Sequence, residues 1–274
     1  MAGYRLSIGD AEIISITDCA MQFPWSVFFP DLPLEEIEAY RDLYPESFGD
    51  KRFRTDAGAY AIRSGGKTVI VDTGLGPGPT AMLGGVIGNL VPDMKEKGIA
   101  PEDVDVVVHT HLHVDHVGWN MTGDTPTFPN ATYYAPEGDL EAFMPLKEQQ
   151  KHIATQVEPL LKLGKLKAYS GEKELAPNVT TLPTPGHTPG HSSIIVGSGA
   201  DYCVVTGDVA HHPAQVDRTD WSPAFDEDGA ASAASRKMLV DRLEKDGGIA
   251  AFCHFPHAFG RIVRQANRRV FQAL

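Results

Sequence analysis

The sequence predicts an α/β fold, built as one domain in which helices cover packed sheets. Three observations support this fold class. Alternating apolar and polar segments flank short glycine-containing turns, apolar runs of strand length recur along the chain, and helix-length segments separate them without a linker. The chain has 274 residues, of which 42% are hydrophobic, and this is enough to bury a large core. We therefore expect residues 1–274 to form a single domain.

Two β-hairpins are predicted in the N-terminal part of the chain. Residues 4–16 alternate on either side of a turn at Gly9-Asp10, and residues 59–71 alternate on either side of a turn at 64–66. Both turns contain glycine, which accepts the backbone angles that tight hairpins need. The fold is therefore expected to begin with antiparallel strands.

The segment between the hairpins, residues 20–56, is rich in aromatic residues and proline. A connection this long inside a compact domain is usually functional or packs elsewhere as an arm. We interpret it as an aromatic N-terminal arm or loop. Its rings are candidates to line an apolar cleft, although packing of the arm onto the core explains them equally well. The candidate cleft residues are Trp25, Phe28, Phe29, Trp119 and Phe143.

Helices and buried strands alternate through the rest of the chain. The run at 104–108 is almost entirely apolar, as expected of a strand that is buried on both faces. The helix predicted before it ends at Gly98. The further predictions are helices over 80–97, 135–163 and 228–245, an extended segment over 179–183, hairpin strands over 192–196 and 201–206, and a strand over 249–253.

Four potential metal ligands follow the strand at 104–108 within six positions: His111, His113, Asp115 and His116. Alternate side chains of an extended chain share a face, so His111 and His113 can bind one ion from the same side. Asp115 and His116 can then turn toward a second ion. Imidazole and carboxylate groups are ligands for Zn²⁺ and, less selectively, for Fe²⁺, Co²⁺ and Mn²⁺. The motif therefore predicts two neighbouring metal ions.

Three further candidate ligands stand at the ends of later predicted strands, where open α/β folds place their sites. They are His187, Asp208 and His254. Each is weak evidence alone, because a strand-end histidine is usually hydrogen-bonded and an aspartate often caps a turn. Their recurrence at strand ends indicates a shared site.

Together these motifs resemble the metallo-β-lactamase superfamily, whose marks are an H-x-H-x-D-H run, a strand that ends in Asp-x-Gly, a later Pro-Gly-His, a strand-end Asp and a final His. The resemblance implies an αββα sandwich with the metals along one edge between the sheets. Within the superfamily the sequence is most similar to methyl parathion hydrolase and its relatives, which include promiscuous lactonases and arylesterases. The superfamily marks are matched by 72–74, 111–116, 185–187, Asp208 and His254, and the narrower group by the aromatic arm, 115–118, 128–131, 187–191 and 254–256.

The resemblance also implies a role for each residue of the site. Asp208 would bridge the two ions, and Asp72 would accept a hydrogen bond that orients a ligand. Many N-acyl homoserine lactone lactonases carry a tyrosine three residues after the bridging aspartate, where this chain has His211. This histidine either donates a hydrogen bond to a substrate oxygen or lies outside the pocket. The implied ligands are His111, His113 and His187 for one ion and Asp115, His116 and His254 for the other, with Asp208 shared, and the implied catalytic residues are Asp115, Asp208 and His211.

The expected activity is dinuclear metal-dependent hydrolysis. Two ions would share a water, lower its pKa toward about 7 and present a bridging hydroxide to a lactone, ester or phosphotriester. Zinc is the expected metal, with manganese, cobalt and iron as alternatives. A glyoxalase-type thioesterase stays open, because arginines near the C-terminus suit the carboxylates of glutathione. An iron-dependent oxidoreductase of the same fold also stays open. The arginines in question are Arg261, Arg264, Arg268 and Arg269.

Composition argues against several classes of partner. The formal net charge of -12 opposes nucleic-acid binding. The chain has neither a basic and apolar leader nor a run of roughly 20 apolar residues, so we expect a cytoplasmic protein without a membrane partner. Cys19, Cys203 and Cys253 form no paired pattern and are expected to be buried as small hydrophobic residues. The expected partner is a small-molecule substrate, and the arm is compatible with a homodimer.

Overall fold

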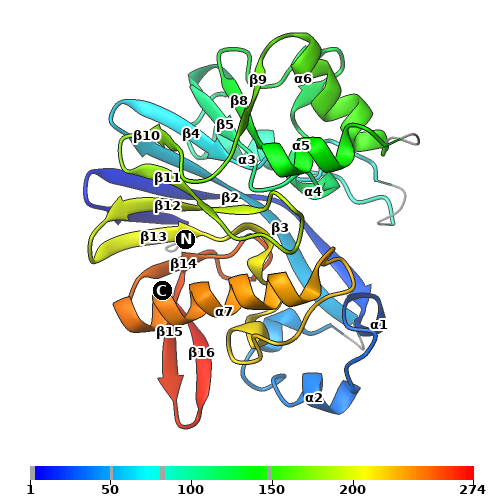
Figure 1. The fold of residues 1–274 in the computed structure, drawn as a ribbon, viewed down its shortest axis with the longest axis vertical. Helices are drawn as coiled ribbons and strands as arrows, with labels where there is room; N and C mark the ends of the chain where they lie inside the picture. Colours follow the sequence, from blue (N-terminus) through cyan, green and yellow to red (C-terminus); the bar gives the residue numbers. More distant parts are fainter. Residues whose placement is uncertain (1–3, 50–51, 81–83, 147–149) are drawn as a thin grey trace.

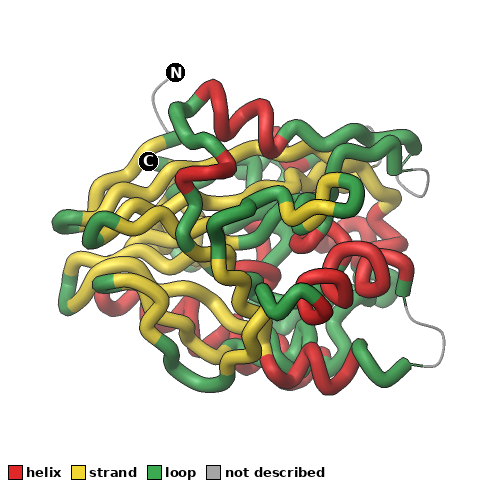
Figure 2. Tube along the Cα trace, turned by 90° about the horizontal axis from the view of Figure 1, so that it is seen from above, coloured by secondary structure: helices red, strands yellow, loops and turns green. Residues whose placement is uncertain are grey.

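The computed structural model describes residues 4–49, 52–80, 84–146 and 150–274 of the chain. Two seven-stranded sheets pack against each other, and helices lie on their outer faces (Figure 1). Seen from above, the strands run as stacked layers with helices beside them (Figure 2). The α/β class predicted from the sequence is confirmed.

The first sheet joins both predicted hairpins to the strand that precedes the histidine motif. Its order is β1-β2-β3-β4-β5-β8-β9, antiparallel from β1 to β4 and parallel from β4 to β9. The segments that follow β4 and β5 therefore emerge at the same edge. The strands are β1 (Arg5–Ile8), β2 (Ala11–Pro24), β3 (Arg52–Ser64), β4 (Lys67–Val71), β5 (Val106–Val108), β8 (Thr132–Pro136) and β9 (Leu166–Tyr169).

The second sheet runs in sequence order from β10 to β16, and only its β13–β14 pair is parallel among the described strands. Its last hairpin, β15 with β16, was not predicted from the sequence. A separate pair is formed by β6 (Met121–Thr122) and β7 (Thr125–Pro126). The strands of the second sheet are β10 (Glu174–Ala176), β11 (Val179–Pro183), β12 (Ser192–Ser198), β13 (Asp201–Val205), β14 (Ile249–Ala251), β15 (Gly260–Gln265) and β16 (Arg268–Ala273).

The structure of β5 explains why the run predicted as a buried strand is apolar throughout. Val107 packs with Ile14 and Leu160 in the cluster on the helix side of the first sheet. Val106 and Val108 belong to the cluster that also contains strand residues of the second sheet. Both faces of this strand are buried, so no polar position alternates along it.

The prediction of an arm or loop over residues 20–56 is wrong at both ends, because β2 and β3 extend into this segment. They remain paired as far as Phe23 with Phe53 and Pro24 with Arg52. Pro24 and Pro33 stand at the N-caps of two short helices, where the missing N–H of proline costs little. The turn between the strands contains α1 (Trp25–Phe28), α2 (Leu34–Glu38) and a 3₁₀ turn, Pro45–Ser47.

Among the described residues of the predicted helix over 80–97, a helix forms as α3 (Leu90–Glu96). Gly84 and Gly85 have positive φ, and a Cβ on Gly88 would lie 2.2 Å from the carbonyl oxygen of Gly76. The described backbone directly before α3 therefore packs closely on Gly76 at Gly88. Residues 81–83 lie outside the described ranges.

The continuous helix predicted over 135–163 is also wrong. Strand β8 reaches Pro136, α5 (Glu137–Phe143) follows, and a π-helical turn (Ile153–Val157) leads into α6 (Glu158–Lys162). Pro145 cannot continue α5, and residues 147–149 are outside the described ranges. The helix predicted over 228–245 is confirmed as α7 (Gly229–Asp246), which Asp228 caps by accepting from the backbone N–H of Ala231.

None of the helices in the described part of the chain is long and apolar enough to cross a membrane.

Candidate metal centre and its cavity

The seven ligands predicted from the sequence come from segments that follow strands of both sheets. The loop after β5 and the short helix α4 (Val114–Val117) carry the histidine motif. His187 follows β11, Asp208 follows β13 and His254 follows β14. The structure brings the seven side chains together in two groups that share Asp208.

The first group contains His111, His113 and His187. Nδ1 of His113 lies 2.9 Å from Nε2 of His187. Oδ2 of Asp208 lies 3.2 Å from Nε2 of His187 and 3.6 Å from Nε2 of His111. These donor atoms all lie within 4.8 Å of one another, which is close enough for one ion to contact them together.

The second group contains His116 and His254, with Asp115 on its outer side. Oδ1 of Asp208 lies 3.1 Å from Nε2 of His116 and 3.0 Å from Nε2 of His254. Carboxylate oxygens of Asp115 are 3.9 Å from each of these nitrogens. Each oxygen of Asp208 therefore faces a different group, as a bridging carboxylate requires.

Hydrogen bonds on the side away from Asp208 determine which ring nitrogen of His116 and His254 carries a proton. Nδ1 of His116 lies 2.9 Å from a carboxylate oxygen of Asp72, and Nδ1 of His254 lies 2.6 Å from the carbonyl oxygen of Asp56. Both oxygens can only accept here, so Nδ1 carries a proton, and Nε2 is the nitrogen left to bind an ion. Metal-bound histidines are oriented in this way.

Unpartnered nitrogens give a further test of whether an ion fits. Nε2 of His111 and Nε2 of His116 are buried and form no hydrogen bond with any described residue, although Asp208 is close to both. A buried nitrogen without a partner is costly, and a bound cation would satisfy it. The donor set of imidazoles and carboxylates fits divalent transition metals.

The Asp72 carboxylate has the orienting position that the resemblance implied. It accepts hydrogen bonds from the backbone N–H and the hydroxyl of Thr110 at 2.8 and 2.7 Å, in addition to its contact with His116. Burial alone would raise its pKa, but the charge of His116 and hydrogen bonds from His109 and His116 lower the pKa of Asp72 to about 2. Burial opposes ionisation of Asp208 as well, yet the imidazoles around it hold its pKa well below the ordinary value.

Two buried carboxylates that support the site were missed by sequence reasoning. Asp139 accepts from the backbone N–H groups of Leu112 and Gly190 and from the hydroxyl of Thr188, and so joins the two histidine-bearing loops. Burial raises the pKa of Asp139 to about 6. Asp226 contacts Nδ1 of His187 at 2.9 Å. Neither lies in a recognisable motif, so no local signal distinguishes them from surface acids.

The other histidines and Cys253 differ in how close they lie to Asp208. Nε2 of His191 accepts from the backbone N–H of Asp208 at 2.9 Å, and His257 is exposed. Nε2 of His211 lies 3.1 Å from Oδ2 of Asp208, and its ring stacks on that of His254. The thiol of Cys253, which we expected to be only a packed strand residue, is buried and donates to Oδ1 of Asp208 at 3.5 Å.

A cavity of about 570 Å³ opens over the two groups. Its ligand end contains His113, Asp115 and Asp208, and His211 lines it as well. The remaining wall is mostly apolar and comes largely from the end of β2, from α1 and from the loop before α7. The apolar lining residues are Met21, Phe23, Val27, Phe28, Val114 and Phe225.

Among the five aromatic residues proposed for a cleft, Phe28 lines this cavity. Trp25 packs on Phe48 and Phe53, and Phe29 packs on Trp221. The indole N–H of Trp119 donates to the buried Asp18. The prediction is therefore right for Phe28, whereas these three rings are packing residues. Phe143 lies 6.1 Å from His113, measured between ring centres.

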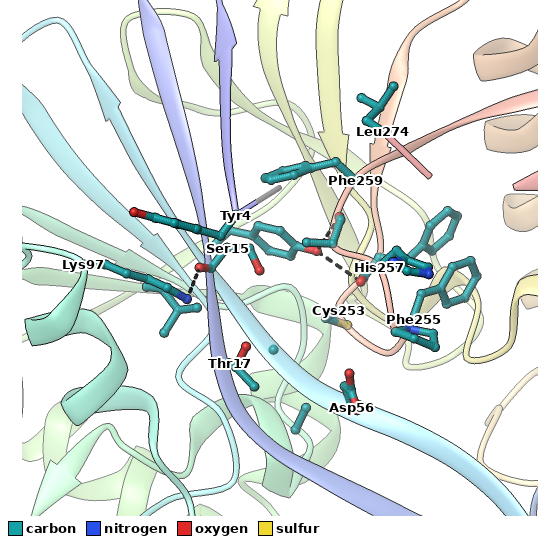
Figure 3. A pocket seen from close by; sticks show the side chains of 17 residues that line it. Tyr4, Ser15, Thr17, Asp56, Lys97, Cys253, Phe255, His257, Phe259 and Leu274 are labelled. Carbon is teal, nitrogen blue, oxygen red and sulfur yellow. Dashed lines mark hydrogen bonds between the residues drawn. The ribbon is translucent and has the colours of Figure 1, made fainter. Parts of the chain in front are cut away.

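A second pocket, of about 250 Å³, shares no lining residue with the first among the described residues. It lies beside β2 and β3 and the loop after β14, and Figure 3 shows Tyr4, Asp56, Cys253 and Phe259 around it. Lys97 reaches it but donates to the carbonyl oxygen of Ser15. This pocket is separate from the cavity over the ligands.

The C-terminal arginines that left a thioesterase activity as an alternative lie away from the cavity. Arg269 pairs with Asp241 and Glu244, and Arg264 pairs with Glu244. The guanidinium of Arg268 lies over the ring of Tyr40. None of the four arginines is among the described residues that line the cavity. The structure therefore gives no support to their role in binding glutathione.

Comparison with known proteins adds to this geometry. Residues 56–254 match the family model described as Metallo-beta-lactamase superfamily. An N-acyl homoserine lactonase from Bacillus sp. is 28% identical over 211 residues, which covers 71% of this chain and 79% of that protein. The solved structure of hydrolase AbOPH in the beta lactamase superfamily has a TM-score of 0.86 at 23% identity, covering 100% of this chain and 98% of that one. The structure of AidC, a dizinc quorum-quenching lactonase in complex with a product, has a TM-score of 0.84 at 20% identity, covering 98% and 96%.

Proposed function

Because this chain belongs to the metallo-β-lactamase superfamily and is a metal-dependent hydrolase, we propose that it hydrolyses uncharged lactones or esters with two divalent ions. The observation that carries this proposal is the division of the Asp208 oxygens between two groups of imidazoles at the base of an apolar cavity. The lactonase similarity supports the same substrate class. Residues 1–274 would act as one unit, since both sheets contribute ligands. The narrower likeness to methyl parathion hydrolase stays a prediction.

We assign the ligands as the sequence implied. His111, His113 and His187 would hold one ion, Asp115, His116 and His254 the other, and Asp208 both. When bound, the ions would supply hydroxide at neutral pH and polarise the substrate oxygen. Zinc is the proposed metal, because the imidazole-rich set suits it.

The chain's own residues would bind and orient the substrate. The apolar wall around Phe28 and Phe225 would hold the non-reacting part of the molecule and exclude water from it. His211 lines the cavity beside Asp208, and burial lowers the pKa of its imidazole to about 4. It would contact the substrate as a neutral ring beside Asp208.

The proposed activity can be tested by comparing metal-free protein with forms reloaded with zinc, manganese or cobalt. The substrates are a γ-lactone, an aryl ester, a thioester and a phosphotriester. We expect about two ions per chain at full activity and faster hydrolysis of the lactone or ester than of the phosphotriester. Hydrolysis that survives exhaustive chelation would overturn the proposal. Oxygen uptake by an iron-loaded form without hydrolysis would favour the oxidoreductase alternative instead.

A further inference from the structure

His187 is held on its outer side by a carboxylate that no sequence motif marks. Nδ1 of His187 lies 2.9 Å from Oδ1 of Asp226, and the Asp226 side chain is fully buried. The other oxygen of Asp226 accepts from the hydroxyl of Ser222 at 2.6 Å. Since the carboxylate only accepts, Nδ1 of His187 carries a proton, and Nε2 is the nitrogen that faces Asp208 and could bind an ion.

The negative charge of Asp226 is balanced by Arg236, which projects from α7 and is itself completely buried. Arg236 places Nη2 at 3.4 Å from Oδ2 of Asp226 and 3.0 Å from the hydroxyl of Ser232. It also donates to the carbonyl oxygens of Val209, Thr219 and Trp221. The Val209 contact is made to the residue next to Asp208.

One buried guanidinium on α7 therefore forms hydrogen bonds with the segment after β13 and with the loop before α7. Two backbone hydrogen bonds close the same loop over the His187 segment, from the N–H of Glu227 to His187 and from the N–H of Asp228 to Gly186. Phe225, next to Asp226, forms part of the cavity wall and contacts the ring of Phe28. The loop before α7 thus contacts both the candidate ligands and the substrate wall.

We propose that Asp226, held by Arg236, is a positioning residue that fixes His187 against Asp208 and so sets the affinity of the first ion. The inference rests on the proposed metal site. A carboxylate behind a ligating imidazole fixes its tautomer and ring plane and raises its basicity. Arg236 allows that carboxylate to stay ionised in a buried place, because a buried charge needs a partner.

The test is metal titration of three variants by competition with a chromophoric chelator. Asp226→Asn keeps the size of the side chain and removes its charge. We expect this variant to bind one of the two zinc ions with an affinity about 10–100-fold lower, and to bind the other ion with unchanged affinity. Asp226→Glu keeps the charge and should restore much of the lost affinity. Glu227→Gln is the matched control, because Glu227 is exposed on the same loop and its carboxylate does not contact His187.

Thermal unfolding of the metal-free variants separates positioning from a structural role. If Asp226→Asn binds both ions as the parent does, the proposal is wrong. It is equally wrong if the affinities for both ions fall together and the unfolding temperature falls with them. The titration does not use a substrate, so its result is independent of whether lactones or esters are hydrolysed.

Discussion

The candidate metal centre and the aromatic cluster beside it bury two neighbouring histidines in different surroundings. His211 faces Asp208 and the cavity. His212, the next residue, points among the rings of Trp25, Tyr44, Phe48 and Phe53, which we call the aromatic cluster. The nitrogen Nδ1 of His212 accepts from the backbone N–H of Ala214 at 3.1 Å, so this imidazole caps a turn.

The difference lies in the charge around each ring. Burial acts alone on His212 and lowers its pKa to about 3, so this imidazole is neutral. Burial also lowers the pKa of His211, to about 4, but the charge of Asp208 and a hydrogen bond to it act in the opposite direction. The comparison teaches that a buried imidazole needs a charged partner beside it to take part in a binding site, which His211 has in Asp208 and His212 lacks.

The largest effect is expected from Asp208→Ala, which removes the group shared by both sets of ligands. We expect metal content to fall well below two ions per chain and activity to fall by at least about 1,000-fold, because several kcal/mol of charge stabilisation are lost. Elemental analysis and turnover measure the two quantities. A variant that retains full activity would remove Asp208 from the site, and the aromatic cluster should keep its packing in either case.

Acid should weaken the aromatic cluster through His212. In the unfolded chain this imidazole takes up a proton near pH 6.5, whereas in the fold it stays neutral down to about pH 3. Its contribution to stability is therefore complete above pH 6.5 and is lost as the pH falls toward 3, by up to about 5 kcal/mol.

The measurement is denaturant unfolding of the metal-free protein across this pH range. His212→Asn keeps an acceptor for the N–H of Ala214 and cannot titrate, so its stability should fall less steeply with acid. An identical slope in both proteins would contradict the assignment.

Trp25→Ala should separate packing from substrate binding. This ring is buried in the aromatic cluster and does not line the cavity, so its removal should cost about 3–5 kcal/mol of unfolding free energy. Relative rates on aromatic and aliphatic esters should stay the same. A changed preference with little loss of stability would move Trp25 into the substrate wall.

His211→Ala is expected to act on turnover rather than on metal content. Removing a group that contacts the substrate oxygen should lower kcat/KM by about 100-fold. Both ions should remain, because neither group of ligands requires this ring. Loss of an ion in step with activity would show instead that His211 holds the centre together.

The smallest effect is expected at the mouth of the cavity. Phe225 is partly exposed there, so Phe225→Ala should raise KM for esters with a large apolar group by about 3–10-fold and leave small esters unaffected. Metal content serves as the control and should not change. An equal rise in KM for small and large esters would argue against an apolar wall.

Sequence patterns predicted the two N-terminal hairpins, β5 and α7, because periodicity and turn residues act over a few positions. They failed where distant contacts decide. Strands β2 and β3 lengthen beyond their alternating core because they pair with each other, and the backbone before α3 is set by its contact with Gly76. The hairpin of β15 and β16 carries four arginines, Arg261, Arg264, Arg268 and Arg269, and gave no strand signal that we recognised.

The donor types of the candidate site were already determined by the sequence, since the donor atoms belong to residue types and the H-x-H-x-D-H spacing places four of them on one short segment. Only the tertiary structure decided which histidine faces Asp208 and which faces the aromatic cluster. It also decided that Asp226 and Arg236 stand behind His187. The local sequence specifies which donor atom a position carries. The surroundings of that atom depend on elements that meet only when both sheets pack. Burial and nearby charge in those surroundings then decide the role of each side chain.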